Sequence, residues 1–367
     1  MDRRDFLKSA AAVTFAAALP QAARADVAFA PKPDAWRSFD LITRVAIDDP
    51  QGRMQAWIPL PSVNEAEWSR AGDSTWKGNA AKVERVRDIR YGAEMLHVTW
   101  NDDEIDPTIE VTSRIATRDR AIDLTKPGTA PALSADARKL NLQGTDLIPV
   151  DGIVKETSDK IIAAAKAKSD IEKARAIYEW VVENTVRTAS TRGCGVGDVA
   201  AMLKSGNLGG KCADLNALYV GLARANGLPA RDVYGLRVAP SKFGYKSLGA
   251  GTSNVTRAQH CRAEVWLAGF GWVPVDPADV RKVMLEEPPA NLALTDAKVA
   301  AARKTLFGAW EGNWIAYNTA HDVTLPGSHN AKVGFLMYPQ AERARLQLDS
   351  LDPDKFRYSI TVKEVAA

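Results

Sequence analysis

The chain has 367 residues, of which 46% are apolar, and it carries 48 Lys and Arg residues against 45 Asp and Glu residues. Without residues 1–25, which contain four basic and two acidic residues, the balance is 44 to 43. A surface this close to neutral argues against nucleic acid or an anionic membrane as the main partner, and the length exceeds one domain of roughly 100–200 residues, which favours two folded units.

The first segment, residues 1–25, has the layout of an export signal. Arg3 and Arg4 precede an alanine-rich apolar run, and Ala23-Arg24-Ala25 gives a small-x-small cleavage pattern. The run is about a dozen residues long, whereas a membrane span needs roughly 20. We expect twin-arginine export, a mature chain in a bacterial periplasm and no stable membrane insertion after cleavage. An ordinary amphipathic helix is the alternative.

The next part, residues 26–126, is patterned as β-strands. Apolar residues alternate with polar or smaller ones in four segments, at residues 41–47, 54–60, 97–100 and 108–116. We predict an antiparallel β domain over 26–126. A connector rich in Pro, Ala and Leu follows at residues 127–151 and has no clear period.

Beyond the connector the pattern becomes helical and then returns to strands. Helices are predicted at 153–168, 170–186 and 198–204, and a further one begins at Cys212. Strands are predicted at 231–239, 260–267, 272–276 and 356–362, with helix and loop over 284–330. Helices followed by a sheet predict an α+β fold, with a core at 152–330 and a C-terminal strand extension at 331–367.

Cys212 stands at the start of its helix, directly after Gly209-Gly210-Lys211. Unpaired backbone N–H groups and the helix dipole favour a negative sulfur at such a position and lower the thiol pKa. The two glycines allow close approach of a substrate and a positive φ. A buried structural cysteine is the alternative, because free cysteine is among the most buried residue types.

The chain has three cysteines, an odd number for an oxidising compartment. A disulfide between Cys194 and Cys261 would leave Cys212 free for chemistry. If Cys212 were paired instead, its reactivity would depend on reduction of that disulfide. All three pairings stay open from the sequence.

His260 is the best partner for the thiol, because it opens a strand after a long glycine-rich loop. Cys261, the next residue, points to the opposite, apolar face of that strand. A four-residue turn at 268–271 would pair Asp276 with Ala263, about 10 Å from His260 along an ideal strand. Asp279 fits His260 better by register, and Asp276 would need twist or a bulge to reach it.

Three ordered motifs resemble the transglutaminase-like superfamily over roughly residues 174–280. They are Lys211-Cys212-Ala213-Asp214, His260-Cys261-Arg262-Ala263-Glu264-Val265 and Gly271-Trp272-Val273-Pro274-Val275-Asp276-Pro277. The resemblance implies a papain-like core, in which a helix packs on an antiparallel sheet, and a catalytic triad of Cys212, His260 and Asp276. Arg262 departs from the family pattern, which commonly has an aromatic residue there.

The resemblance implies thiol-dependent acyl transfer or hydrolysis on a protein or peptide substrate, through a cysteine thioester. Water as acceptor would make the protein a peptidase or amidase, and an amine would make it a cross-linking enzyme. The Cys212 backbone N–H would bind the oxyanion, with Asn207 or Trp180 as weak candidates for a second donor. The alternative is a non-catalytic periplasmic binding module that retains the fold.

We expect no cofactor and no metal, and the sequence does not indicate an oligomeric state. There is no GxGxxG after a strand, no P-loop and no haem or iron–sulfur cysteine run, so an exported cofactor enzyme is the weakest hypothesis. His321-Asp322 has no HExxH or CxxC companion to make a metal site. The aromatic segment 309–318 would line an extended cleft or form a lid on the β domain.

Overall fold

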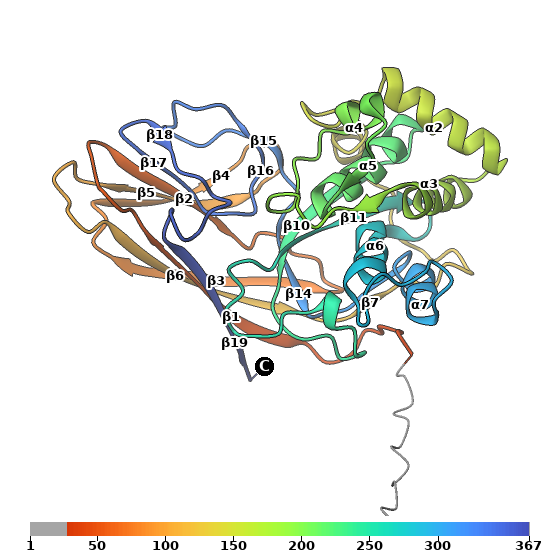
Figure 1. The fold of residues 1–367 in the computed structure, drawn as a ribbon, viewed down its shortest axis with the longest axis horizontal. Coiled ribbons are helices and arrows are strands. Elements are labelled where there is room, and N and C mark those ends of the chain that lie inside the picture. The colour runs from red at the N-terminus through yellow and green to blue at the C-terminus, as the bar shows by residue number, and fades with distance from the viewer. Residues whose placement is uncertain (1–27, 367) are drawn as a thin grey trace, which may run out of the picture.

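The computed structural model describes residues 28–366, so the predicted signal at 1–25 lies outside the described residues. In Figure 1, two β-sheets occupy one half of the molecule and most of the helices gather in the other half. The α+β class predicted from the sequence is confirmed. Within the described residues, none of the helices has the length and apolar character that crossing a membrane requires.

The first half is built from two antiparallel sheets whose apolar faces share one core. One sheet has the strand order β19 (Tyr358–Val365), β1 (Arg37–Ala46), β6 (Thr108–Thr117), β3 (Ser69–Gly78). The other has the order β18 (Leu346–Gln347), β17 (Gln340–Arg343), β2 (Met54–Leu60), β5 (Glu94–Trp100), β4 (Lys82–Arg87).

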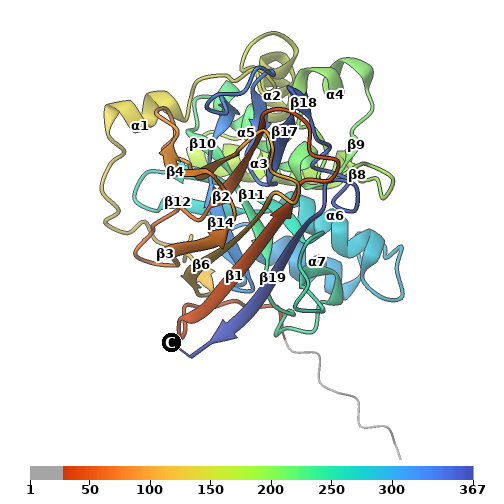
Figure 2. The same ribbon diagram turned by 90° about the vertical axis from the view of Figure 1, so that its left-hand side faces the viewer.

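The C-terminal strand belongs to this β-sandwich. β19 lies antiparallel to β1, with Leu41 opposite Val362, and Figure 2 shows the two strands side by side. The chain therefore leaves the sandwich, forms the helical half and returns to the sandwich. This return brings residues of the C-terminal segment to the site described below.

The second half surrounds the central helix α5 (Cys212–Ala225). Every residue of α5 is buried, because the helix packs between other helices and a four-stranded sheet. The sheet has the order β12 (Gly271–Val275), β11 (Gln259–Leu267), β10 (Ala230–Arg237), β14 (Trp314–Asn318). The other helices are α1 (Ala135–Leu140), α2 (Gly152–Ala165), α3 (Asp170–Asn184), α4 (Val199–Ser205), α6 (Pro277–Glu286), α7 (Ala297–Thr305) and the 3₁₀ turn η1 (Lys246–Leu248).

Short pairs of strands join the remaining segments. They are β7 (Arg120–Ala121) with β13 (Ala309–Trp310), β8 (Val186–Arg187) with β9 (Gly209–Gly210), and β15 (His321–Val323) with β16 (Val333–Phe335). The prediction of helix and loop alone over 284–330 is therefore wrong, because this region also supplies β14 to the central sheet.

The aromatic segment 309–318 is neither a cleft wall nor a lid. Trp310 and Trp314 are each 1% exposed, and both rings contact Trp68 of the N-terminal half. The segment is core because β14 pairs with β10 in the central sheet and all of its residues are buried.

Candidate active site

Cys212 is the first residue of α5 and is 3% exposed. Its neighbour Ala213 donates its backbone N–H to the Cys194 carbonyl at 2.9 Å. The Cys212 backbone N–H has no hydrogen-bond acceptor among the described residues. That N–H is one of the free donors of the first helical turn, so it is available to an anion bound beside the sulfur.

The Asp214 carboxylate holds the start of α5 in place. It accepts the Lys211 N–H at 2.9 Å and also the N–H groups of Val196 and Gly197, at 3.0 and 2.9 Å. The position of this carboxylate also explains why residue 210 is a glycine, because a Cβ there would lie 2.4 Å from Asp214 Oδ2. Neither Gly209 nor Gly210 adopts the positive φ that glycine allows, and Gly210 is needed because a side chain there would collide with Asp214.

His260 stands on β11 and meets two carboxylates. Its Nε2 lies 2.8 Å from Asp276 Oδ2 and 3.3 Å from Asp279 Oδ2. Since Nε2 faces these acids, Nδ1 is the ring nitrogen left for Cys212, whose thiol pKa the imidazole lowers. The Trp314 indole donates to the His260 carbonyl at 2.9 Å and fixes the strand at this point.

Asp276 reaches His260 by a route that the strand register did not predict. The hairpin pairs Ala263 with Val275, one residue from the predicted pairing with Asp276. Asp276 then caps α6 and accepts the Asp279 N–H at 3.0 Å. The chain turns into a helix at Pro277, so both acids of the first turn lie beside the imidazole, and no bulge is involved.

Two buried arginines balance the two acids. Arg237 donates to Asp279 Oδ1 at 2.6 Å and to the Leu248 carbonyl at 2.6 Å. The Arg262 Nε lies 3.6 Å from Asp276 Oδ2, and its guanidinium lies over the Trp314 ring at 4.7 Å. The Arg262 side chain thus supports Asp276 from within the core, and it does not line the pocket beside Cys212.

Asn216 is a further site residue that the sequence analysis missed. It lies one turn after Cys212 on α5 and is fully buried. Its Nδ2 donates to the Cys261 carbonyl at 2.8 Å and to Asp276 Oδ1 at 3.3 Å. The signal in the sequence was an asparagine four residues after the thiol within a helix that is otherwise apolar on this side.

The charges of the site favour an ion pair between Cys212 and His260. Burial and the Arg237 charge would lower the pKa of His260, but the carboxylates of Asp279 and Asp276 raise it to about 9. Burial would raise the pKa of Cys212, but hydrogen bonds from two neighbouring thiols and from His260, together with the His260 charge, lower it well below the usual value. Both shifts favour the thiolate–imidazolium pair over the neutral thiol and imidazole.

The pKa values of the two acids are shifted in opposite directions. Burial opposes ionisation of Asp279, but the Arg237 guanidinium and the His260 imidazole hold its pKa well below the usual range. Burial and the nearby Asp279 carboxylate raise the pKa of Asp276. Asp279 is therefore the firmly ionised member of the pair.

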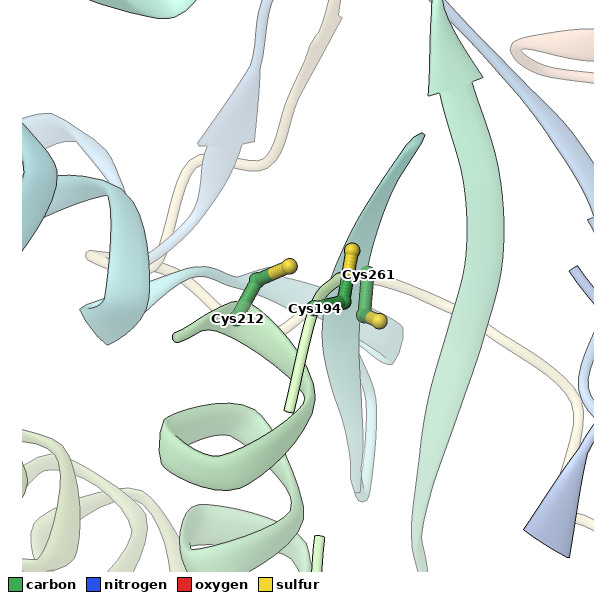
Figure 3. A group of neighbouring side chains, drawn as sticks. All are labelled: Cys194, Cys212 and Cys261. Carbon is green, nitrogen blue, oxygen red and sulfur yellow. The ribbon is translucent and has the colours of Figure 1, made fainter. Parts of the chain in front are cut away.

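The three cysteines form one cluster of free thiols. Their Sγ atoms lie within 4.8 Å of one another, and Figure 3 shows Cys212 at the first turn of α5 with Cys194 and Cys261 beside it. Burial raises the pKa of Cys261, and the Cys212 hydrogen bond raises the pKa of Cys194. Cys212 is thus the thiol of the cluster whose ionisation its surroundings favour. Three sulfurs at this spacing are a donor set for a soft, thiophilic metal.

A pocket of about 460 Å³ opens beside Cys212 and His260. One wall comes from the C-terminal segment, through Tyr338, Leu351 and Tyr358. The β-sandwich therefore shapes the access to the thiol. Asn207 and Trp180, the candidate second oxyanion donors, do not line this pocket; Trp180 packs against the core of the helical half.

The other histidines with described partners lie elsewhere. His97 bonds to Gln55 at 3.0 Å and stacks on Trp57 in the β-sandwich, as a structural histidine does. His321 Nδ1 lies 3.2 Å from the Tyr234 hydroxyl and belongs to β15. Neither lines the pocket beside Cys212.

Comparison with known proteins identifies a family and an export signal. Residues 155–277 match the model of the transglutaminase-like superfamily, and residues 1–20 match the twin-arginine translocation pathway signal, which indicates export across the cytoplasmic membrane. A Haemophilus influenzae protein described as uncharacterized is 39% identical over 330 residues, which are 86% of this chain and 87% of the relative.

One solved structure supports the fold at low identity, and a second is similar over part of the chain. A protein described as a candidate cysteine protease from Cytophaga hutchinsonii is 14% identical, with a TM-score of 0.50 over 90% of this chain and 99% of its own. The periplasmic domain of TgpA from Pseudomonas aeruginosa is 16% identical, with a TM-score of 0.32 over 66% of this chain and 88% of its own.

Proposed function

Because the chain belongs to the transglutaminase-like superfamily, we propose that it is a periplasmic hydrolase that cleaves peptide or amide bonds through a thioester on Cys212. The observation that carries the proposal is the chain of contacts from the Cys212 thiolate through His260 to Asp276, at the edge of an open pocket. A non-catalytic module has no need of a buried thiolate paired with an imidazolium.

The first step is attack of the Cys212 sulfur on the carbonyl carbon of the substrate. The Cys212 backbone N–H supports this step, because it is free to donate to the developing oxyanion. His260 then gives its proton to the leaving amine as a general acid. The products of this half-reaction are the free amine and an acyl group in thioester linkage to Cys212.

The second step is transfer of the acyl group to water. His260, now neutral, takes a proton from the attacking water while the carboxylates at Nε2 stabilise the new imidazolium. The thioester C–S bond breaks, and the thiolate and the carboxylic acid are restored. We favour water as the acceptor because it is abundant in the periplasm, whereas an amine acceptor must be bound specifically.

Trapping of the acyl-enzyme tests the proposal. The purified mature protein is incubated with a periplasmic peptide extract, quenched in acid and analysed by mass spectrometry. We expect an adduct on Cys212 that hydroxylamine releases as a hydroxamate and that Cys212→Ala abolishes. Release of the acyl group onto an added primary amine in preference to water would make the protein a cross-linking enzyme, and absence of any adduct would favour the binding module.

A further inference from the structure

The pocket beside Cys212 is lined by cations without facing carboxylates. Its basic residues are Arg187, Lys211, Arg237, Arg257 and Lys282. Among the described residues, no Asp or Glu lines it. Clefts with charge of one sign concentrate ligands of the opposite sign, so this lining is a feature of the site that the proposed chemistry alone does not require.

Acids outside the lining offset only part of this charge. Arg187 and Lys282 share the carboxylate of Glu286, with Lys282 at 3.7 Å. Arg257 pairs with the exposed Asp354 at 2.6 Å.

Lys211, the residue before Cys212, makes no ion pair with any described residue. Asp214, the acid nearest to it in sequence, is held by three backbone N–H groups and does not line the pocket. Two positive charges, one from Lys211 and one from the pair that shares Glu286, therefore remain in the lining of the pocket. The ion pair of Cys212 and His260 is itself neutral.

The cations are also close enough to repel one another. Burial and the nearby Arg237 charge lower the pKa of Lys282 to about 8. Such crowding of like charge is unfavourable in the empty site and is relieved when an anion enters. The side chain of Lys282 is 18% exposed, so it is shielded from water yet accessible from the pocket.

We propose that this pocket binds an acyl donor that carries a carboxylate close to the bond to be cleaved, namely an acidic peptide. The inference rests on the proposed function, since it names the substrate class of the same site. Lys211 and Lys282 are the residues that select this substrate. The carboxylate belongs either to an acidic side chain or to the end of the peptide.

Alkylation of Cys212 tests the charge of the pocket without any substrate. The rates of reaction with iodoacetate, an anion, and iodoacetamide, its neutral counterpart, are compared with those of a small free thiol. We expect the ratio of the iodoacetate rate to the iodoacetamide rate at Cys212 to exceed the same ratio for the free thiol by about tenfold at low salt. At about 1 M salt the Cys212 ratio should fall towards the value for the free thiol. Lys211→Gln and Lys282→Gln each lower the ratio, whereas Lys160→Gln, an exposed change on α2, leaves it unchanged.

Matched peptides identify the source of the carboxylate. Glu and Gln peptides of one sequence, each with a free or an amidated C-terminus, are compared by kcat/KM. A preference of about tenfold or more for the Glu peptide would show that the pocket recognises a side-chain carboxylate. The same preference for the free C-terminus would show that it recognises the terminal carboxylate. A ratio of alkylation rates equal to that of the free thiol, with Cys212 still reactive, would overturn this inference alone. A Cys212 that resists both reagents would overturn the proposed function as well.

Discussion

The buried imidazolium of His260 makes a measurable contribution to stability. Two carboxylates raise its pKa from the ordinary 6.5 to about 9. The folded protein therefore binds this proton more tightly than the unfolded chain does. The stability that results is fully present below about pH 6.5 and is lost as the pH rises through about 9. At about 1.4 kcal/mol for each pH unit, the loss amounts to about 3 kcal/mol.

In the natural protein this loss is hidden by Cys212. The thiolate has a lowered pKa in the folded state, so its contribution grows with pH over the same range and opposes that of His260. The experiment therefore uses Cys212→Ser, in which the group at position 212 does not titrate. The free energy of unfolding in urea is measured from pH 6 to 9.5 for this variant and for the double variant that also carries His260→Gln.

We expect the difference in unfolding free energy between the two variants to fall by about 3 kcal/mol across this range. Shared groups that do not interact with His260 cancel in that difference. The cost of placing Gln in the core shifts the level of the difference without changing its slope. Curves that run parallel from pH 6 to 9.5 would refute the buried imidazolium, and with it the role assigned to the carboxylates at Nε2.

Two further changes test the scaffold of the site by urea unfolding. Asp279→Asn leaves the buried Arg237 without its charged partner and should lower the free energy of unfolding by about 3–5 kcal/mol. Asp354→Asn, in an exposed pair with Arg257, should lower it by about 1 kcal/mol or less. Equal losses would count against a stabilising role of the buried pair. Gly210→Ala places a Cβ 2.4 Å from Asp214 Oδ2 and should cost about 1–3 kcal/mol. Gly251→Ala, with nothing within 4 Å of its Cβ, should cost less than about 0.5 kcal/mol, and similar losses would show that the contact is unimportant.

The sequence predicts best where local patterns and packing agree. The helix that begins at Cys212 has clear start and stop signals and forms over Cys212–Ala225. The strands with one apolar face, β1 and β6 among them, also form where predicted. By contrast, β3 and β4 are mostly exposed, so they carry little of the alternation from which strands are read.

Contacts between distant segments could not be read from the sequence. Strand spacing alone placed Asp279 nearer His260 than Asp276, whereas the start of α6 brings both acids to the imidazole. The roles of Arg237 and Asn216 depend on which elements pack together, and no local pattern shows that. For the same reason the clustering of three cysteines and the wall that the C-terminal segment adds to the pocket emerge only from the folded chain.

The most direct test of the central claim is the pH dependence of Cys212 alkylation by iodoacetamide in the folded protein. An anionic sulfur held by His260 predicts a rate that reaches half its maximum well below pH 8.5, the ordinary thiol value, and a shift of that midpoint to higher pH in His260→Gln. A midpoint at or above 8.5 in the natural protein, or one that His260→Gln does not move, would contradict the account.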